Sequence, residues 1–457
     1  MALAELLPAD PDRLLAAAAV AVGYVGLCGG TALGRLRKRA PATPAGMAAA
    51  GDVTVAFASQ TGLAEQLAAR TLAFVAASGA TVRLVPLAAL DRAALERGGR
   101  LLLVLSTTGE GDAPDAAAGF ARRVLGGTAD LSRLRYGLLA LGDRDYRHFC
   151  AFGLAVAQWL DRNGAHPIFP PMTVDDGDPE ALARWQTALA AAGLGEDAAA
   201  PDWTEEPPFG TWRLAERRPL NPDDAEHPAF HLAFVAEDGA AEWQAGDLAR
   251  IRIPGEPECH RDYSIASIPA EGRLTLLVRL ARRPDGTVGR GSGWLAEGLA
   301  DGGTVRLQIR RNPGFHAPAG DPPLVLIGSG TGLAGLRAHL AARAACGIGG
   351  AWLLFGERRR AADWFHREDI EGWIRSGVID RLDLAFSRDQ AERVYVQHRL
   401  RAAAADLVRR IDEGAAILVC GSAAGMAPAV HAVLEDALGR DRLERLAEAG
   451  RYRRDVY

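Results

Sequence analysis

The sequence is poor in lysine and in clustered positive charge, and this excludes one class of partner. Lys38 is the only lysine, so that 51 of the 52 basic residues are arginine. The net charge is −5, and the arginines are scattered along the chain. A protein that binds nucleic acid concentrates positive charge in order to displace counterions from the phosphates. Nucleic acid is therefore not expected as a partner.

Cysteine is also scarce, and its positions form no motif. The five cysteines lie far apart without any CxxC pair: Cys28, Cys150, Cys259, Cys346 and Cys420. Iron–sulfur clusters and structural zinc sites need clustered thiolates, and a disulfide scaffold needs many cysteines in a short secreted chain. No metal centre is expected, and the globular part is expected in a reducing compartment.

Disordered or low-complexity sequence does not dominate the chain. The 457 residues are 49% hydrophobic and 24% charged, as in ordinary globular proteins. At about 150 residues per domain, this length predicts roughly three domains.

The first fifty residues differ from the rest. Residues 14–34 are a run of 21 residues without a charge, and four basic residues follow at 35–39. A helix that rises about 1.5 Å per residue would just cross a hydrocarbon core of about 30 Å over this run. By the positive-inside rule, the basic flank predicts that everything after residue 35 lies in the cytoplasm.

Two other interpretations of this segment stay open. One is a signal peptide, although its charge order would be reversed and the only cleavage site, near residue 47, is a poor match. The other is a buried alanine-rich helix of a soluble fold. The alanine- and arginine-rich composition is typical of a bacterial genome of high GC content. The main expectation is therefore a single-pass anchor in the bacterial inner membrane, with the catalytic domains facing the cytoplasm and a linker at 35–50.

After residue 51, short apolar runs alternate with helical patterns. The predicted strands are 53–59, 101–106, 136–142 and 166–170, and amphipathic helices are predicted at 62–77 and 149–163. Continuous apolar runs are typical of strands that are buried on both faces of a parallel sheet. The alternation predicts a doubly wound α/β domain, whose ligand site lies at the carboxyl ends of the strands.

Three of these strands are followed by loops with unusual chemistry. Loop 59–62 (SQTG) runs into a helix, loop 106–115 (STTGEGDAPD) is polar and glycine-rich, and loop 141–149 (LGDRDYRHF) carries an aromatic residue. Hydroxyl groups and free backbone N–H groups at a helix start cradle a phosphate, and an aromatic ring stacks on a flat ligand. Each loop alone also fits an ordinary cap or turn. Three of them at one sheet edge favour a ligand site.

The middle of the chain changes to short alternating strands, after an acidic, proline-bearing stretch at 196–208 that is predicted to be a linker. The alternation predicts an antiparallel barrel. In the segment 261–264 (RDYS), Arg261 and Tyr263 fall on the same face of a strand. One can hold a pyrophosphate while the other stacks on a ring. A glycine-rich helix start, 289–295, follows some thirty residues later.

The last third returns to strand–helix alternation. Residues 323–340 combine a strand, a glycine loop and a helix, which is the arrangement that holds a dinucleotide pyrophosphate, although the loop is not a strict GxGxxG. Further ordered segments are 352–358 (WLLFGER), 384–390 (LAFSRDQ), 394–397 (VYVQ), 416–426 (AILVCGSAAGM) and 451–457 (RYRRDVY).

In this order, the segments resemble the diflavin reductase family, in which a flavodoxin is fused to a ferredoxin–NADP reductase module. The resemblance covers residues 51–457 and is nearest to the flavoprotein subunit of bacterial sulfite reductase and to NADPH–cytochrome P450 reductase. It implies a flavodoxin-like α/β domain, an antiparallel β-barrel FAD domain and an α/β NADP-binding domain, after an N-terminal transmembrane helix. The expected boundaries are 1–34 (N-terminal segment), 35–50 (linker), 51–195 (FMN domain), 196–208 (linker), 209–320 (FAD domain) and 321–457 (NADP domain).

The resemblance also implies roles for individual residues. FMN is expected at Ser59, Gln60, Thr61, Gly62, Thr107, Gly109, Glu110, Asp143, Tyr146 and Phe149, with Tyr146 stacked on the ring. FAD is expected at Arg261, Tyr263, Ser264, Gly291, Ser292 and Gly293. NADPH is expected to place its pyrophosphate at Gly328, Gly330, Thr331 and Gly332, and its 2′-phosphate at Ser387, Arg388, Tyr395 and Gln397. The catalytic residues are expected to be Ser264, Cys420 and Asp455, which would assist hydride transfer, and Tyr457, which would stack on FAD.

The sequence departs from the family in two respects. Relatives of the sulfite and P450 type carry a connecting domain of a hundred-odd residues ahead of the RxYS motif, whereas here only twelve residues separate Leu248 from Arg261. How the two flavins meet without that domain is therefore open. In addition, Ser422 and Gly335 stand where many relatives have aspartate and proline.

The implied activity is that of an enzyme that passes electrons from NADPH to FAD, then to FMN, and then to a haem-containing or other one-electron acceptor protein. Given the predicted anchor, the main expectation is a membrane-anchored NADPH–haemoprotein reductase with an acceptor in the membrane. The alternative is the flavoprotein component of an assimilatory sulfite reductase. A third interpretation is a non-catalytic flavin-binding module. The acceptor is expected to meet the acidic loops at the FMN edge, which contain Glu110, Asp112, Asp143, Asp145, Asp175 and Asp176.

Overall fold

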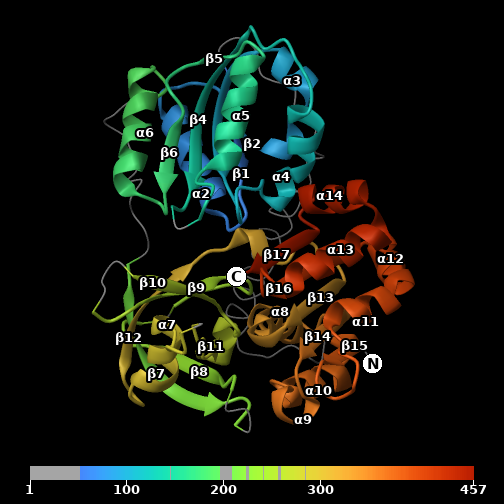
Figure 1. Ribbon diagram of the computed structural model, residues 1–457. Helices are drawn as coiled ribbons and strands as arrows, with labels where there is room; N and C mark the ends of the chain where they lie inside the picture. Colours follow the sequence, from blue (N-terminus) through green and yellow to red (C-terminus); the bar gives the residue numbers. More distant parts are fainter. Residues whose placement is uncertain are drawn as a thin grey trace, which may run out of the picture. The chain divides into compact units, whose positions relative to one another are not determined.

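Three β-sheets organise the chain (Figure 1). The computed structural model describes residues 52–144, 146–195, 208–222, 226–239, 241–255, 259–283 and 285–457, all of which belong to one compact unit. The predicted membrane segment 14–34 and the linker 35–50 lie outside these residues, as do Asp145 and nearly all of the linker 196–208. No helix in the described ranges has the length and hydropathy that crossing a bilayer requires.

The first sheet is parallel, with the strand order β2-β1-β3-β4-β5, and β6 also pairs with β4. Its strands are β1 (Val53–Ala58), β2 (Val82–Pro86), β3 (Gly99–Ser106), β4 (Leu134–Gly142), β5 (His166–Pro167) and β6 (Met172–Asp175). Its helices are α2 (Leu63–Ala77), α3 (Arg92–Glu96), α4 (Asp115–Phe120), α5 (Ala151–Arg162) and α6 (Pro179–Ala191), and a π-helical turn at Ala121–Leu125 extends α4. The predicted doubly wound α/β domain is confirmed.

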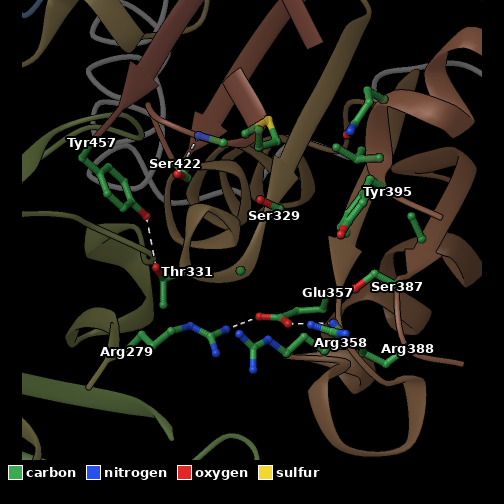
Figure 2. A pocket seen from close by; sticks show the side chains of 18 residues that line it. Arg279, Ser329, Thr331, Glu357, Arg358, Ser387, Arg388, Tyr395, Ser422 and Tyr457 are labelled. Atoms are coloured by element: carbon green, nitrogen blue, oxygen red, sulfur yellow. Dashed lines mark hydrogen bonds and ion pairs between the residues drawn. The ribbon is translucent and has the colours of Figure 1, made fainter. Parts of the chain in front are cut away.

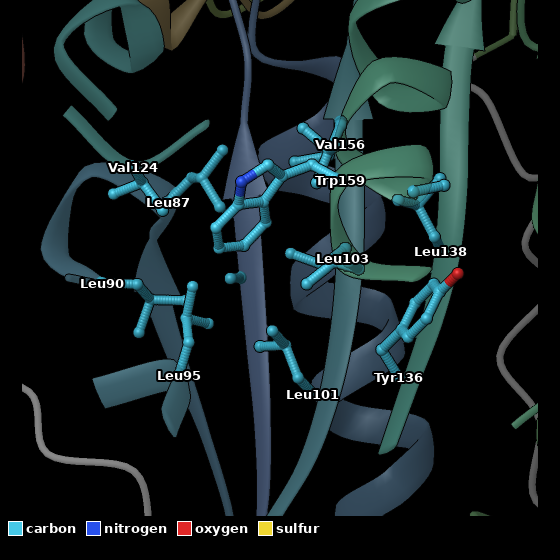
Figure 3. Close-up of a cluster of buried hydrophobic side chains, with 14 of the residues drawn as sticks. Leu87, Leu90, Leu95, Leu101, Leu103, Val124, Tyr136, Leu138, Val156 and Trp159 are labelled. Atoms are coloured by element: carbon cyan, nitrogen blue, oxygen red, sulfur yellow. The ribbon is translucent and has the colours of Figure 1, made fainter. Parts of the chain in front are cut away.

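The apolar run of β3 explains why this sheet is buried on both faces. Leu101, Leu103 and Leu105 point into a core shared with α3, α4 and α5, whereas Leu102 and Val104 point into a second core under α2 and α6. Figure 3 shows the first core, in which Trp159 lies near the leucines of β3. Its indole N–H donates to the carbonyl of Gly127 at 2.7 Å, so that the buried ring leaves no polar group unpaired.

One strand is shorter than the sequence predicts. The run 166–170 contributes only β5, and β6 forms separately two residues beyond it. Pro167, Pro170 and Pro171 lack the N–H group that a β-ladder needs. The chain therefore leaves the sheet at these prolines and returns at Met172.

The second sheet is antiparallel, with the strand order β10-β9-β12-β7-β8-β11. A bridge between Ile265 and Leu276 joins the segment after β10 to β11, so that the sheet closes on itself as a barrel. The strands are β7 (Gly210–Pro219), β8 (Ala229–Ala236), β9 (Leu248–Arg252), β10 (His260–Ser264), β11 (Leu274–Arg279) and β12 (Thr304–Arg310), with the short helix α7 (Arg290–Gly293). The predicted barrel is thus the observed architecture.

The third sheet is parallel, with the strand order β15-β14-β13-β16-β17. Its strands are β13 (Leu324–Ser329), β14 (Ala351–Glu357), β15 (Ile379–Phe386), β16 (Ala416–Gly421) and β17 (Tyr452–Val456). Its helices are α8 (Leu333–Ala345), α9 (Arg360–Asp363), α10 (Arg367–Arg375), α11 (Val396–Ala402), α12 (Ala404–Asp412), α13 (Met426–Leu438) and α14 (Arg440–Glu448). Strand order reverses between β13 and β16, which is where such sheets bind ligands, outside the carboxyl ends of the strands.

Candidate functional site

The loop after β1 forms a cradle at the start of α2. The Ser59 hydroxyl accepts a hydrogen bond from the backbone N–H of Gly62 at 2.9 Å, and Gly62 adopts a left-handed conformation with φ +94°. A fifteen-residue helix begins directly afterwards, and its free N–H groups attract a phosphate. Thr61 is exposed at the loop, whereas the amide of Gln60 faces Asp115 and exchanges two hydrogen bonds with it, both at 3.0 Å.

The loop after β3 contains a polar atom that the fold leaves unsatisfied. The Thr107 hydroxyl is buried and has no hydrogen-bond partner among the described residues. Next to it, Thr108 and Asp112 exchange backbone hydrogen bonds of 2.9 and 2.8 Å. Gly109 and Gly111, which lie between them, have φ +51° and +121°, and Glu110 is exposed at the tip of this turn. Because an unpaired buried hydroxyl is costly, Thr107 fits a ligand that supplies its partner.

The two aromatic residues of the loop after β4 lie in different environments, one exposed and one packed against the core. Tyr146 is 52% exposed beside Asp143, which is partly buried, so its ring is accessible for stacking. Phe149 instead packs against the core, and the guanidinium of Arg144 lies 4.8 Å from the centre of its ring. Phe149 thus supports the loop from below. Together the three loops provide a phosphate cradle, an unsatisfied hydroxyl and an open ring, which fits FMN.

A second site lies on the barrel, in a cavity of about 490 Å³. Arg261, Tyr263 and Ser264 line it from β10, and Gly291 and Ser292 line it from α7. Four further arginines, which the sequence did not single out, line the same cavity: Arg279, Arg282, Arg283 and Arg290. Such positive charge suits a pyrophosphate.

The walls of this cavity are closely packed around a glycine. A Cβ atom on Gly291 would lie 3.0 Å from the Arg261 side chain and 3.1 Å from the hydroxyl of Tyr263. Burial raises the pKa of Tyr263 to about 12, so that its phenol remains neutral beside a flat ligand. Gly293 does not line the cavity, because it packs behind α7, where a Cβ would lie 2.4 Å from Val288. The cavity fits FAD.

A third site, of about 630 Å³, opens at the carboxyl ends of β13, β14, β15 and β16 (Figure 2). The lining includes most of the residues predicted for the nucleotide: Gly330, Thr331, Ser387, Arg388, Tyr395 and Gln397. Gly328 and Gly332 lie beneath it instead. A Cβ on either would lie 2.8 or 2.2 Å from the carbonyl oxygen of Cys420. These two glycines let β13 and the following turn approach β16 closely.

One corner of the third site is basic. Backbone hydrogen bonds from Ser387 to Glu357 (2.9 Å) and from Arg388 to Arg358 (2.8 Å) hold the segments after β14 and β15 side by side. Arg388 is exposed, and no hydrogen bond or ion pair joins its side chain to another described residue. Two arginines with Tyr395, itself 40% exposed, suit a phosphate on an adenosine ribose.

Sequence reasoning missed Arg279 and Glu357, which form an ion pair in this site. Burial raises the pKa of Glu357 to about 7, against the opposing pull of the Arg279 charge. Glu357 is the last residue of β14, the strand beside β13 and its glycine loop, so the sequence could have predicted that it lies at the carboxyl ends of the strands, where the ligand binds. Arg279 gave no such signal, because its place depends on the register of the barrel.

The four predicted catalytic residues lie together, although the chain separates them by up to 193 positions. The Ser264 hydroxyl donates to a carboxylate oxygen of Asp455 at 2.6 Å, and the Cys420 thiol donates to the same oxygen at 3.6 Å. Burial raises the pKa of Asp455, which these two donors counteract. Burial and the nearby Asp455 raise the pKa of the Cys420 thiol well above its usual value, so it stays protonated.

Tyr457 joins the second and third sites. It lines both cavities, as do Arg279 and Thr331. The Tyr457 hydroxyl lies 3.2 Å from that of Thr331, and 58% of the residue is exposed (Figure 2). The two cavities therefore share a wall at Tyr457.

Comparison with known proteins gives consistent matches. The flavodoxin family model matches residues 55–185, and the model of the oxidoreductase NAD-binding domain matches residues 326–432. The sulfite reductase (NADPH) flavoprotein alpha-component of Thiocapsa roseopersicina is 30% identical, over 84% of this chain and 83% of that protein. The same component of Neisseria meningitidis serogroup C (strain 053442) is 30% identical, over 89% of each chain.

A third relative bears on the missing connecting domain. The sulfite reductase (NADPH) flavoprotein alpha-component of Vibrio cholerae serotype O1 (strain N16961) is 27% identical, over 90% of this chain and 88% of its own length. The alignment spans 543 positions, which is more than the 457 residues of this chain. The relative therefore contains segments that have no counterpart here.

We expect the Arg388→Ala variant to lose affinity for NADPH selectively. A charge-assisted hydrogen bond to a phosphate corresponds to on the order of 10- to 150-fold in binding, so KM for NADPH should rise by about that factor. KM for NADH, which lacks the 2′-phosphate, should stay nearly constant. Arg401→Ala, which removes an exposed arginine of α11 paired with Asp436, is the control. Equal losses with both nucleotides would mean that Arg388 supports the fold.

Glu357 should make nucleotide binding depend on pH. Its raised pKa means that it takes up a proton as the pH falls from about 8 to about 6, and the neutral group no longer repels the nucleotide phosphates. KM for NADH, chosen because it has no titrating 2′-phosphate, should therefore decrease over this interval. In the Glu357→Gln variant it should be low and constant. A pH profile that is the same in both proteins would contradict this role.

Proposed function

The chain belongs to the diflavin reductase family, and on this basis we propose that it is the NADPH-oxidising flavoprotein component of a sulfite-reductase-type enzyme, donating electrons to a separate haemoprotein. It is an NADPH-dependent flavin oxidoreductase with FMN, FAD and NADPH as its cofactors. One observation carries the proposal. Tyr457, Thr331 and Arg279 form a wall common to the dinucleotide cavity and the arginine-rich cavity, so that two ligand rings can meet there.

The choice of acceptor rests on the relatives. All three relatives named above are flavoprotein alpha-components of sulfite reductase, so they favour the alternative stated in the sequence analysis over a membrane haemoprotein reductase. The relatives are named as the flavoprotein component of their enzyme, so the proposal assigns the haem to a partner protein.

The residues of the chain bind and orient their ligands in this scheme. When bound, NADPH supplies a hydride, and the two flavins convert it into single-electron transfers. Arg358 and Arg388 hold the adenosine phosphate, while Arg261 and its neighbours hold the FAD pyrophosphate. Ser264 and Cys420 donate hydrogen bonds to Asp455 and so fix the carboxylate beside the meeting point. Tyr457, on the wall that the two cavities share, would cover a flavin ring bound there and would have to move aside for a nicotinamide.

Reconstitution tests the proposed acceptor. The purified chain, loaded with FMN and FAD, is mixed with the haem-containing component of a bacterial sulfite reductase. We expect NADPH oxidation that requires both the haem component and sulfite, and that produces sulfide. A protein that reduces ferricyanide with NADPH but leaves this haem component oxidised would contradict the proposal.

We also propose that residues 14–34 anchor the protein in the bacterial inner membrane, with residues after 35 in the cytoplasm. The support is the charge-free run and its basic flank, by the positive-inside rule. The full chain should sediment with membranes and resist extraction by alkaline carbonate, whereas a chain starting at Gly51 should stay in the supernatant. If carbonate releases the full chain, the segment is not a membrane span.

A further inference from the structure

The carboxylate of Asp115 connects the flavodoxin domain to the last strand of the NADP domain. Asp115 begins α4 directly after the second FMN loop, and it is hydrogen-bonded to Gln60 of the first. The same carboxylate binds both Nε and Nη2 of Arg454, with the Nε contact at 2.6 Å. The two side chains are only 14% and 24% exposed. This is a bidentate, largely buried ion pair, the geometry in which arginine–carboxylate contacts are strongest.

Strand β17 and the residue that follows it contact three different sites. Arg454 binds Asp115, and Asp455, the next residue, accepts the hydrogen bonds of Ser264 and Cys420. Successive side chains of a strand point to opposite sides, so a single peptide unit separates the contact with the flavodoxin domain from the cluster of Ser264, Cys420 and Asp455. This cluster is called the hydride site below. Two residues further on, Tyr457 reaches Thr331 between the two cavities.

The first FMN loop is also packed directly against the reductase. A Cβ on Gly314 would lie 1.9 Å from the carbonyl oxygen of Gln60, and a Cβ on Gly62 would lie 2.4 Å from the Pro313 ring. Arg453 of β17 donates to the carbonyl of Pro313, so this second contact leads to the same strand. The phosphate cradle is thus linked to β17 in two ways, through Asp115 to Arg454 and through Pro313 to Arg453.

Ion pairs whose arginines are more exposed, at 44%, surround these contacts, although Glu444 and Glu448 are only 12% and 19% exposed. Arg122 and Arg123, which follow α4, pair with Asp441, Glu444 and Glu448 on one face of α14. His260 of the barrel lies 3.7 Å from Asp176. Exposed pairs contribute little individually and are screened by salt. Arg454 and Asp115 therefore occupy the position of a central contact with a polar rim.

We propose that Arg454 is a positioning residue that couples docking of the flavodoxin domain to the geometry of the hydride site. While Asp115 holds Arg454, β17 keeps Asp455 in register with Cys420, its partner in β16. Loss of the ion pair releases the flavodoxin domain and, through the same strand, disturbs Asp455. The inference rests on the proposed electron path only as far as FAD and FMN, and it does not depend on the identity of the acceptor.

Small-angle X-ray scattering of the full chain tests the docking. Arg454→Gln and Asp115→Asn should each shift the balance between docked and undocked forms by on the order of 10- to 150-fold towards the undocked form, and so increase the radius of gyration. Arg454→Lys should recover part of the compaction, because it keeps the charge and loses the bidentate contact. Arg442→Gln, which removes an arginine of α14 paired within the NADP domain to Asp412, should have no effect.

Stopped-flow reduction of the flavins by NADPH, without any acceptor protein, tests the coupling. Asp115→Asn changes a residue that lines neither the NADP nor the FAD cavity, yet we expect it to slow the first phase of flavin reduction as Arg454→Gln does. The charge exchange Asp115→Arg with Arg454→Asp should restore both readouts. Unchanged scattering in the single variants would overturn the docking role. Expanded protein with an unchanged first phase would overturn the coupling, whichever acceptor the protein serves.

Discussion

The arrangement of the reductase depends on one partly buried carboxylate. Asp455 accepts hydrogen bonds from Ser264 of the barrel and Cys420 of the neighbouring strand, so it joins β10, β16 and β17 at a single oxygen. A carboxylate withdrawn from water is unfavourable unless donors satisfy it, and here Ser264 of the barrel and Cys420 of the third sheet supply those donors. This contact ties the barrel to the third sheet, and Tyr457, two residues further along, lines both cavities.

Close backbone approach is the second constraint. Gly332 lets the turn after β13 lie against Cys420, and Gly335, one turn later, leaves room above the thiol, because a Cβ there would come within 3.3 Å of the sulfur and 3.0 Å of the Phe315 ring. The space over Cys420 is therefore set by the neighbouring Phe315 and Asp455 and not by a side chain at position 335.

The features that the sequence predicted are those encoded by residues close together in the chain. Continuous apolar runs predicted the parallel strands, and the polar loops at their carboxyl ends indicated a ligand site in the first domain, whereas FMN as its ligand and the role of Arg388 were implied only by the family resemblance. Three of the seven glycines assigned to ligands, Gly293, Gly328 and Gly332, instead make room for close packing within the fold, a distinction that motif spacing does not contain. Arg279 depends on barrel register, and the pairing of Arg454 with Asp115 joins residues 339 positions apart. No local pattern encodes such contacts.

Because the connecting domain is missing, the long-range contacts between the flavodoxin domain and the reductase are needed to set the distance between the two flavins. A large apolar interface would fix that distance permanently, whereas a buried bidentate pair with a screened rim of arginines and acids fixes an orientation and still dissociates. Since the central pair is built on the strand that also carries Asp455, the docked orientation and the hydride site are specified by the same backbone. With this contact in place, a connecting domain is not needed to hold the two flavins at their distance. The chain accordingly passes from β9 to β10 through a short loop, at the point where relatives of the sulfite and P450 type carry that domain.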